Sequence, residues 1–369
     1  MKANASRPIV IAAGGTGGHF YPAEALAAEL LSRGERVVLL TDARSTGLAS
    51  AVFARAEKHV VSGAGLAGRG LRRAVGGGLQ LLKGTLEARA ILKSLKPRAV
   101  VAFGGYPSVP PVLAAASLRG TAHPRVILHE QNAVLGRANR LLARFADLLA
   151  LNFAATLRLP QGVPVLVVGN PVRPAIAALH GAPYTPPGEV IELFVLGGSL
   201  GAKVFSTLIP EALARLPAAL RARLNLVQQV RAEDVEQARA VFKLAGIKAE
   251  LSPFFTNVPE HLARAHLVIA RAGASSVAEI AVAGRPAIFI PLPTAIDDHQ
   301  RENARALVDA GGAWRFDQAA LTPDILAEKI ETLLTTPETL AQAAAASAAL
   351  GRTDAAARLA DFVLEGVTP

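Results

Sequence analysis

Four glycines, a threonine and a histidine follow a short apolar run near the start of the chain, in IAAGGTGGHF at residues 11–20. A strand that turns into a helix through glycines exposes backbone N–H groups, and the helix N-terminus adds the positive end of a dipole. Such a bend binds anions, and phosphate above all. His19 closes the stretch. An imidazole there can act as a general base, cap the helix or donate to a phosphate.

A second loop of the same kind, GGSLGAK at residues 197–203, follows the apolar run IELFVL at 191–196. Glycines serve tight turns in general, but two such loops at equivalent places in two halves favour a pair of phosphate-binding bends. In open parallel sheets, ligands bind beyond the carboxyl ends of the strands. The sequence therefore predicts a ligand-binding cleft between two domains.

The elements that must position these loops alternate between β-rich runs and helical patterns, which predicts parallel sheets built from βαβ units. The expected strands cover residues 9–13, 36–41, 59–62, 99–103, 125–129, 148–152, 163–168, 191–196, 224–230, 267–270 and 287–293, and helices are expected at 22–34 and 86–96. A segment rich in Pro and Gly, 178–189, is typical of a linker. The predicted fold class is α/β, with two doubly wound, Rossmann-like domains.

Composition narrows the function classes. The 369 residues carry a net charge of +10, which suits nucleic acid, an anionic membrane surface or a phosphorylated substrate. Aromatic residues make up only 5% and no recognition motif is present, so nucleic acid is not an expected partner. The absence of cysteine excludes disulfides and thiolate metal sites. The uncharged run 99–118 contains a Gly pair and three prolines, so a strand, a loop and a helix are expected there rather than a membrane span.

Two motifs suggest other chemistries. GAGLAG at 63–68 fits a dinucleotide fingerprint with Glu87 at the acidic position, but it follows the third strand rather than the first. GGSLG at 197–201 fits a nucleophile elbow on Ser199, and an Asp-Asp-His run at 297–299 follows in triad order. That esterase hypothesis gives the first glycine loop no role. The acidic pair at 297–298 lacks the spacer of a D-x-D metal motif, so no bound metal is expected.

The motifs GGTGGHFYPAEALA, GGYPSVP, HEQNAVLGRANR, GNPVR, GGSLGAK and RAGASSVAEIAVAGRPAIFIPLP with DDHQRENA, over residues 8–350, resemble a bacterial glycosyltransferase family. This family moves N-acetylglucosamine from UDP-N-acetylglucosamine to the 4-hydroxyl of undecaprenyl-pyrophosphoryl-N-acetylmuramyl-pentapeptide (lipid I), with inversion, and so forms the cell-wall precursor lipid II. A transferase or epimerase that uses a UDP-sugar on another acceptor is the alternative within the fold. The resemblance implies the two-domain GT-B architecture with no cofactor. It implies an acceptor domain over 1–172, against which a final helix at about 350–369 packs, and a UDP-sugar domain over 173–349.

The same resemblance assigns the site residues. His19 is the candidate general base, and Tyr106 and Glu130 lie on the acceptor side. Glu279 binds the ribose, the backbone at Phe255 reads uracil, and Gln300 with His299 grips the donor sugar. The remaining donor contacts are Thr16, Gly17, Gly18, Asn132, Arg173, Ser199, Ala274, Ser275 and Ser276. A surface position for Arg173 and a structural role for Glu130 and Gln131 stay open.

The acceptor lipid implies a peripheral site on the cytoplasmic face of the membrane, with other cell-wall synthesis proteins as further partners. Segment 68–96 mixes basic and apolar residues, which suits an anionic leaflet as well as a solvated helix. Its three consecutive glycines, 76–78, argue against one continuous helix.

Overall fold

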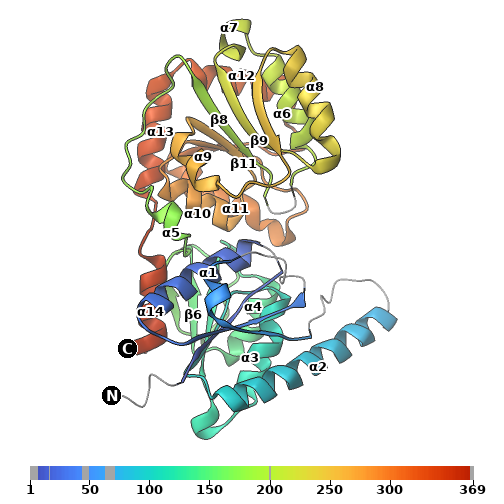
Figure 1. Ribbon diagram of the computed structural model, residues 1–369, viewed down its shortest axis with the longest axis vertical. Coiled ribbons are helices and arrows are strands. Elements are labelled where there is room, and N and C mark those ends of the chain that lie inside the picture. Colours follow the sequence, from blue (N-terminus) through green and yellow to red (C-terminus); the bar gives the residue numbers. More distant parts are fainter. Residues whose placement is uncertain (1–6, 16, 44–49, 63–70, 199–200, 366–369) are drawn as a thin grey trace. The chain divides into compact units, whose positions relative to one another are not determined.

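The computed structural model describes residues 7–15, 17–43, 50–62, 71–198 and 201–365 (Figure 1). The chain forms two compact units. The first comprises the described residues up to Arg173 together with those from Asp354 on, and the second comprises Pro174–Thr353. A domain boundary after residue 172 was expected, and the division of contacts falls after Arg173.

Within its described residues, the first unit contains a seven-stranded parallel sheet in the order β3-β2-β1-β4-β5-β6-β7. The strands are β1 (Ile9–Ala12), β2 (Val37–Thr41), β3 (Glu57–Val60), β4 (Ala99–Ala102), β5 (Arg125–Glu130), β6 (Leu148–Leu151) and β7 (Val165–Val167). The order reverses between β1 and β4, and this switch point is where open α/β sheets bind ligands.

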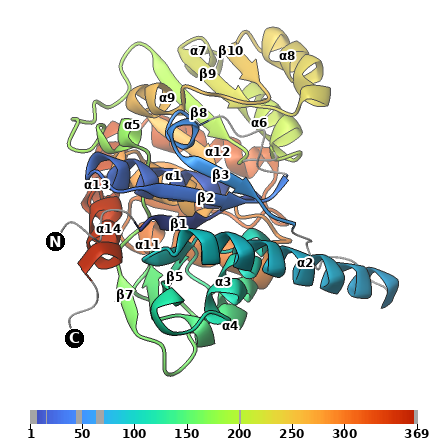
Figure 2. The ribbon, with the colours of Figure 1, turned by 60° about the horizontal axis from the view of Figure 1, so that its bottom comes forward.

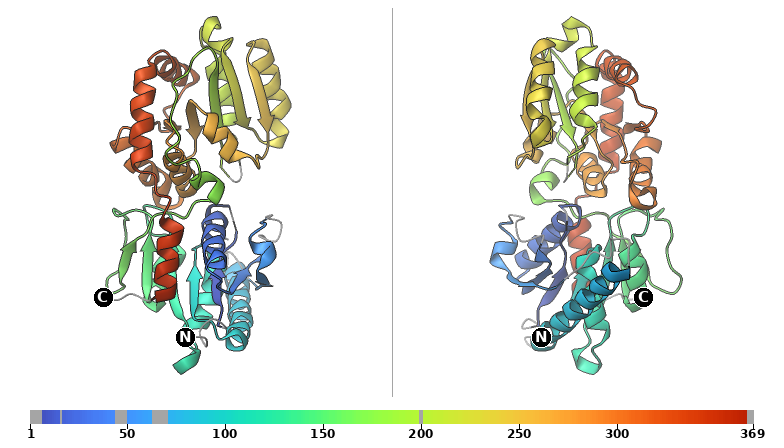
Figure 3. Two further views of the ribbon diagram at one scale, coloured as in Figure 1. Left: turned by 60° about the vertical axis from the view of Figure 1, so that its left-hand side comes forward. Right: turned by 90° about the vertical axis from the view of Figure 1, so that its right-hand side faces the viewer.

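Helices cover both faces of this sheet, as Figures 1 and 2 show. They are α1 (Gly17–Ser32), α2 (Leu71–Leu95), α3 (Val109–Ala116), α4 (Arg137–Leu142) and α14 (Ala355–Glu365), with short 3-10 turns at 53–55, 106–108, 120–122 and 143–145. Ile9 and Ile11 pack with α1 and α14, whereas Val10 and Ala12 pack with α2, α3 and α4. Strands buried on both faces explain the continuous apolar runs in the sequence. The final helix α14 lies beside α1 (Figure 3).

Helix α2 is continuous from Leu71 to Leu95, so the expectation that Gly76–Gly78 interrupt it is wrong. Each glycine costs about 1 kcal/mol of helix propensity, and contacts made further along the helix offset that cost. α2 packs on α3, and the Glu87 carboxylate accepts hydrogen bonds from the Ser62 N–H at 2.7 Å and hydroxyl at 3.0 Å. A Cβ at Gly84 would lie 1.8 Å from the Ser62 carbonyl oxygen, so only glycine permits this approach.

The second unit repeats the design, with a parallel sheet in the order β10-β9-β8-β11-β12-β13 among its described residues. Its strands are β8 (Ile191–Leu196), β9 (Leu224–Gln229), β10 (Lys248–Ser252), β11 (Leu267–Ala270), β12 (Ala287–Phe289) and β13 (Ala313–Arg315). Its helices are α5 (Pro174–Ala177), α6 (Phe205–Ala214), α7 (Ala218–Arg221), α8 (Val235–Leu244), α9 (Val258–Arg264), α10 (Ala274–Val282), α11 (His299–Asp309), α12 (Pro323–Leu334) and α13 (Pro337–Ala349), with 3-10 turns at 232–234 and 296–298.

The switch point of this sheet lies between β8 and β11. The prediction of two doubly wound, Rossmann-like domains is confirmed. No helix in the described ranges is both long enough and apolar enough to cross a bilayer.

Candidate active site

His19 lies in the first turn of α1, directly after the bend that follows β1. Gly15 makes this bend with a φ of 85°, a conformation that favours glycine. Gly17 and Gly18 open the helix, and a Cβ at Gly17 would lie 2.8 Å from the Tyr21 ring. Thr16 lies outside the described residues. The sequence therefore sets an imidazole at the switch point of the first sheet.

The loop after β4 forms a wall beside the His19 ring. Gly104 and Gly105 adopt φ values of 81° and 68°. A Cβ at Gly105 would lie 3.3 Å from Cδ2 and 3.4 Å from Nε2 of His19, and a Cβ at Gly104 would lie 3.7 Å from Cε1. Only glycine satisfies both the backbone angle and the close approach.

We therefore expect Gly105→Ala to lower kcat about tenfold, because strain at a positive φ and the added methyl group displace the imidazole. Steady-state kinetics will measure this change. Gly34→Ala is the matched control, because Gly34 also has a positive φ of 79° but a Cβ there meets nothing within 4 Å. Equal losses in the two variants would contradict the role of the wall.

The other side of His19 is held by a residue from the HEQN motif. His19 Nδ1 lies 3.0 Å from Gln131 Oε1. The Gln131 amide donates to the Phe103 carbonyl at 2.9 Å, and it also lies 3.3 Å from His129 Nδ1. His129 Nε2 lies 2.9 Å from the Gly169 carbonyl. This chain joins residues of three of the predicted motifs, and Phe103 directly precedes a fourth. No role was predicted for His129, although its place at the end of a strand beside β4 is a usable signal.

His129 is fully buried, and burial lowers its pKa to about 4. Its hydrogen bond to the Gly169 carbonyl opposes this shift, and the neighbouring His19 adds to it. The ring is therefore neutral throughout the physiological range.

This shift predicts acid sensitivity. Because the folded-state pKa of His129 is below its unfolded value of 6.5, unfolding takes up a proton between pH 6.5 and about 4. The stabilisation is complete above pH 6.5 and is lost as the pH falls to about 4, with a slope of up to about 1.4 kcal/mol per pH unit. Urea unfolding at a series of pH values will measure the slope. His129→Gln should make the slope shallower, and an identical slope in the variant would refute the assignment.

Glu130 is buried and its carboxylate is fully engaged. One oxygen accepts from the Asn132 backbone and side chain at 2.9 and 3.0 Å, and the other accepts from the Gly136 N–H at 2.8 Å and Asn139 at 2.9 Å. These bonds fold the loop that leads into α4, and they favour the structural alternative for Glu130. Asn132 is held at the edge of that loop. Tyr106 is 38% exposed at the start of the 3-10 turn after the glycine wall.

Arg173 is the last residue of the first unit before the chain continues into the second. Its guanidinium lies over the Tyr21 ring of α1, 4.8 Å from the ring centroid. The stacked guanidinium is held at one place, as a phosphate contact requires.

In the second unit, the loop after β8 is anchored by Gln229. The Gly197 N–H donates to Gln229 Oε1 at 3.1 Å, and Gln229 Nε2 donates to the Gly198 carbonyl at 3.0 Å. Gly198 and Gly201 have φ values of 83° and 66°. Ser199 lies outside the described residues. Gly198 therefore has nearly the same φ as Gly15 in the first bend.

Helix α10 begins at the other side of the same switch point. Its cap residue, Gly273, supplies no side-chain oxygen to the first turn, which consists of Ala274, Ser275 and Ser276. An uncapped helix N-terminus next to a glycine bend is suited to a diphosphate. Glu279, 8% exposed, lies one turn further along the same helix.

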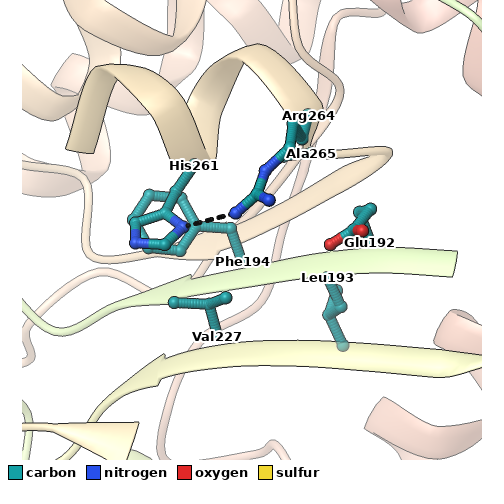
Figure 4. A pocket seen from close by; sticks show the side chains of 7 residues that line it. All are labelled: Glu192, Leu193, Phe194, Val227, His261, Arg264 and Ala265. Atoms are coloured by element: carbon teal, nitrogen blue, oxygen red, sulfur yellow. Dashed lines mark hydrogen bonds between the residues drawn. The ribbon is translucent and has the colours of Figure 1, made fainter. Parts of the chain in front are cut away.

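Phe255 is positioned by an aromatic cluster that packs against β8. Its ring meets His261 edge-on, with centroids 5.1 Å apart, and His261 lies against Phe194 of β8 at 5.2 Å. Figure 4 shows His261, Phe194 and Arg264 among the residues that line a small void. Its volume is about 10 Å³. A void of this size holds one water molecule at most. The cluster therefore fixes the backbone of 255 rather than a ligand.

Gln300 lies in the first turn of α11. Its Oε1 accepts from the Leu292 N–H at 2.9 Å, and among the described residues its Nε2 donates to none, so that NH₂ group can serve a ligand oxygen. His299 Nδ1 donates to the Ile296 carbonyl at 2.7 Å.

The esterase alternative is not supported by this loop, because Asp298 pairs with Arg301 at 2.8 Å rather than with His299. In the ranges that the structure describes, no three His, Cys, Asp or Glu side chains gather as metal ligands. Of the dinucleotide motif, 63–68 lies outside the described residues, and the Glu87 carboxylate is bonded to Ser62.

A cavity of about 370 Å³ lies elsewhere in the first unit, between the ends of β2 and β3 and helix α2. It is lined by Asp42, Ala43, Val60, Val61, Ser62, Gln80, Lys83 and Glu87. None of the predicted site residues lines it, so the candidate site rests on the switch points and not on cavity size.

Comparison with known proteins shows the family of the chain. Residues 9–150 match the glycosyltransferase family 28 N-terminal domain, and residues 192–359 match its C-terminal domain. A UDP-N-acetylglucosamine–N-acetylmuramyl-(pentapeptide) pyrophosphoryl-undecaprenol N-acetylglucosamine transferase of Granulibacter bethesdensis is 60% identical over 97% of this chain and 94% of its own. The equally named protein of Acidiphilium cryptum is 58% identical over 100% of this chain and 99% of its own.

Among solved structures, Acinetobacter baumannii MurG superimposes with a TM-score of 0.75 at 30% identity, over 96% of this chain and 98% of its own. A two-domain chain with glycine bends at both switch points, and with relatives this close over nearly its whole length, belongs to glycosyltransferase family 28 and, within it, to the UDP-N-acetylglucosamine–N-acetylmuramyl-(pentapeptide) pyrophosphoryl-undecaprenol N-acetylglucosamine transferases.

Proposed function

We propose that this chain transfers N-acetylglucosamine from UDP-N-acetylglucosamine to the 4-hydroxyl of the N-acetylmuramyl group of lipid I, and so forms lipid II. Relatives at 58–60% identity are named for this transfer, which supports these substrates. The observation that carries the mechanism is the imidazole of His19, fixed between the glycine wall and Gln131 at the switch point of the first sheet.

The second unit holds the donor in this proposal. The diphosphate binds at the bend after β8 and the N-terminus of α10, where Ser275 and Ser276 lie. The Glu279 carboxylate accepts hydrogen bonds from the ribose hydroxyls, and the backbone at Phe255 reads uracil. The Gln300 NH₂ group donates to a sugar hydroxyl, because the hydrogen bond from the Leu292 N–H to Gln300 Oε1 orients the amide. Backbone dipoles aimed at the departing diphosphate stabilise its growing charge.

The first unit supplies the base. The acceptor 4-hydroxyl attacks C1 of the donor sugar on the face opposite UDP, and His19 Nε2 takes the hydroxyl proton. The new C1–O bond forms as the bond from C1 to the β-phosphate oxygen breaks, and the electron pair leaves with UDP. The configuration at C1 inverts. Asn132 and Arg173 complete the donor contacts from this unit, and Tyr106 contacts the acceptor.

The direct test is incubation with labelled UDP-N-acetylglucosamine and a short-chain lipid I analogue, followed by mass analysis of the lipid product. The expected product is the acceptor plus one N-acetylhexosamine, with one UDP released for each transfer. A 4-deoxy acceptor is the matched control and should stay unmodified. UDP release without a glycosylated lipid would refute the proposed transfer.

We also propose that the chain works on the cytoplasmic face of the membrane, bound to the anionic surface through α2. Leu79, Leu82 and Leu86 are 63%, 56% and 58% exposed, and their spacing puts them on one helix face. Lys83 lies among them with 70% of its side chain exposed. Exposed leucines beside a lysine suit a membrane surface, where the leucines can enter the acyl-chain region and the lysine can contact anionic headgroups.

We expect the triple variant Leu79→Ser, Leu82→Ser, Leu86→Ser to bind vesicles of phosphatidylglycerol and phosphatidylcholine about tenfold more weakly, because it loses the apolar area that the bilayer would bury. Co-sedimentation will measure the partition. Leu244→Ser is the matched control, because Leu244 is 90% exposed on α8 of the other unit. If the triple variant sediments like the wild type, α2 does not bind the membrane.

A further inference from the structure

The hydrogen bonds around His19 have a direction, and two main-chain carbonyls set it. A carbonyl oxygen only accepts hydrogen bonds. The Gly169 carbonyl lies 2.9 Å from His129 Nε2, so that nitrogen carries the proton of the neutral ring. His129 Nδ1 is then a bare acceptor, and it faces the Gln131 amide at 3.3 Å.

The Phe103 carbonyl fixes the same amide independently. It lies 2.9 Å from Gln131 Nε2. A flipped amide would set Oε1 against this carbonyl and against the bare His129 Nδ1, which are both acceptors. The NH₂ group must therefore face Phe103 and His129, and Oε1 must face His19. Gln131 is 2% exposed and His129 is fully buried, so water does not compete for these bonds.

His19 lies at the end of this chain of hydrogen bonds. Gln131 Oε1 lies 3.0 Å from His19 Nδ1 and only accepts, so Nδ1 must carry the proton of the neutral ring. We propose that Gln131, oriented by the Phe103 carbonyl and by His129 on the Gly169 carbonyl, is a positioning residue that holds neutral His19 in its Nδ1–H tautomer and so leaves the Nε2 lone pair ready to take the acceptor proton. We call this set of hydrogen-bonded groups, from the Gly169 and Phe103 carbonyls through His129 and Gln131 to His19, the relay. This inference rests on the proposed role of His19 as base.

The relay explains why His129 must stay neutral. A second proton, on its Nδ1, would point at the Gln131 NH₂ group, so two donors would face each other. The amide could then no longer keep the orientation in which the Phe103 and Gly169 carbonyls both accept a hydrogen bond. Burial of the ring lowers its pKa to about 4, which prevents that protonation at the pH of the cell. The positive φ of Gly169, 93°, belongs to the bend that supplies the anchoring carbonyl. An amide can thus orient a histidine without adding a charge beside it.

Nitrogen NMR tests the relay without any substrate. The full chain labelled with ¹⁵N-histidine is measured at pH 8, well above the range where imidazoles ordinarily titrate, and His19→Asn identifies the His19 signals. We expect His19 Nδ1 to show the shift of a protonated ring nitrogen and Nε2 that of a bare one. The reverse pattern in the wild type overturns the relay, whatever the variants do.

Gln131→Met removes the acceptor but keeps the size of the side chain. We expect His19 to leave the Nδ1–H form, and kcat to fall about tenfold, the effect of one lost orienting hydrogen bond, with the KM for UDP-N-acetylglucosamine within about twofold. Gln131→Glu keeps an acceptor oxygen toward His19 Nδ1 and should restore the Nδ1–H signal. Gln228→Met is the matched control, since Gln228 is equally buried and donates to the Phe205 carbonyl at 2.9 Å in the other unit.

The outcomes separate the relay from the proposed function. Retention of the Nδ1–H tautomer in Gln131→Met overturns the relay, and so does an equal loss of kcat in Gln228→Met. If Gln131→Met does not fold, the wild-type spectrum alone decides. A chain with the expected spectrum that transfers no sugar refutes the proposed function and leaves the relay standing.

Discussion

His19→Ala is expected to lower kcat about 10³-fold, the middle of the range for loss of a general base. The binding of UDP-N-acetylglucosamine should change by less than about twofold, because the proposed donor contacts lie in other residues. The physical reason is that the acceptor hydroxyl is a weak nucleophile until a positioned base takes its proton. Product analysis gives kcat, and isothermal titration with the sugar nucleotide gives Kd.

His180→Ala is the matched control for this loss, since His180 is exposed and lies after α5 in the second unit. It should keep wild-type kcat. The assignment of His19 as base fails if His19→Ala weakens donor binding while the bound complex turns over at the normal rate. In that case His19 would donate a hydrogen bond to a phosphate of the donor. Its place in the first turn of α1 leaves that alternative open.

Glu279→Ala is expected to raise the KM for UDP-N-acetylglucosamine about 30-fold, with kcat at saturation within about threefold. A carboxylate that accepts two ribose hydroxyls makes charge-assisted hydrogen bonds, each of which contributes roughly 1.5–3 kcal/mol. These bonds are equal in the ground state and the transition state, so their loss appears in KM and not in kcat. Glu279→Gln keeps the volume of this buried side chain and separates lost charge from lost packing.

The control is Glu236→Ala, because the side chain of Glu236 is 87% exposed on α8. It should leave the KM for the donor unchanged. An unchanged KM and Kd in Glu279→Ala would remove this residue from the nucleotide site. A fall in kcat with an unchanged Kd would instead give Glu279 a part in the chemical step.

Much of the fold follows from local pattern. The runs 191–196 and 267–270 are strands with the predicted bounds, because apolar runs of that length between turn signals fit strands buried on both faces. The glycine bends are local too, since Gly15 and Gly198 need a positive φ that other residues rarely adopt. Helix α2 was misjudged for the opposite reason. Its three glycines are unfavourable locally, and the contacts that hold the helix, with α3 and between Glu87 and Ser62, are made with residues distant in the sequence.

In the candidate site, too, local sequence predicts some residues, whereas others depend on contacts between distant segments. His19 and Glu279 were predicted from motifs, but nothing local indicated that Gln131 would orient one of them. Gln131 meets His19 across 112 positions of sequence, and Gly169 meets His129 across 40. The sheet order 1-4-5-6-7 brings these strand ends together, and no single segment encodes that adjacency.

The sequence by itself predicted which backbone bends can receive a diphosphate and which side chain can take a proton, because both predictions depend on residue type and local conformation. Only the tertiary structure decided which nitrogen of His19 is free to do so. Hydrogen-bond direction is fixed by the acceptors at the far end of a chain of contacts, here the carbonyls of Phe103 and Gly169, and these reach the imidazole only when the parallel strands are assembled side by side.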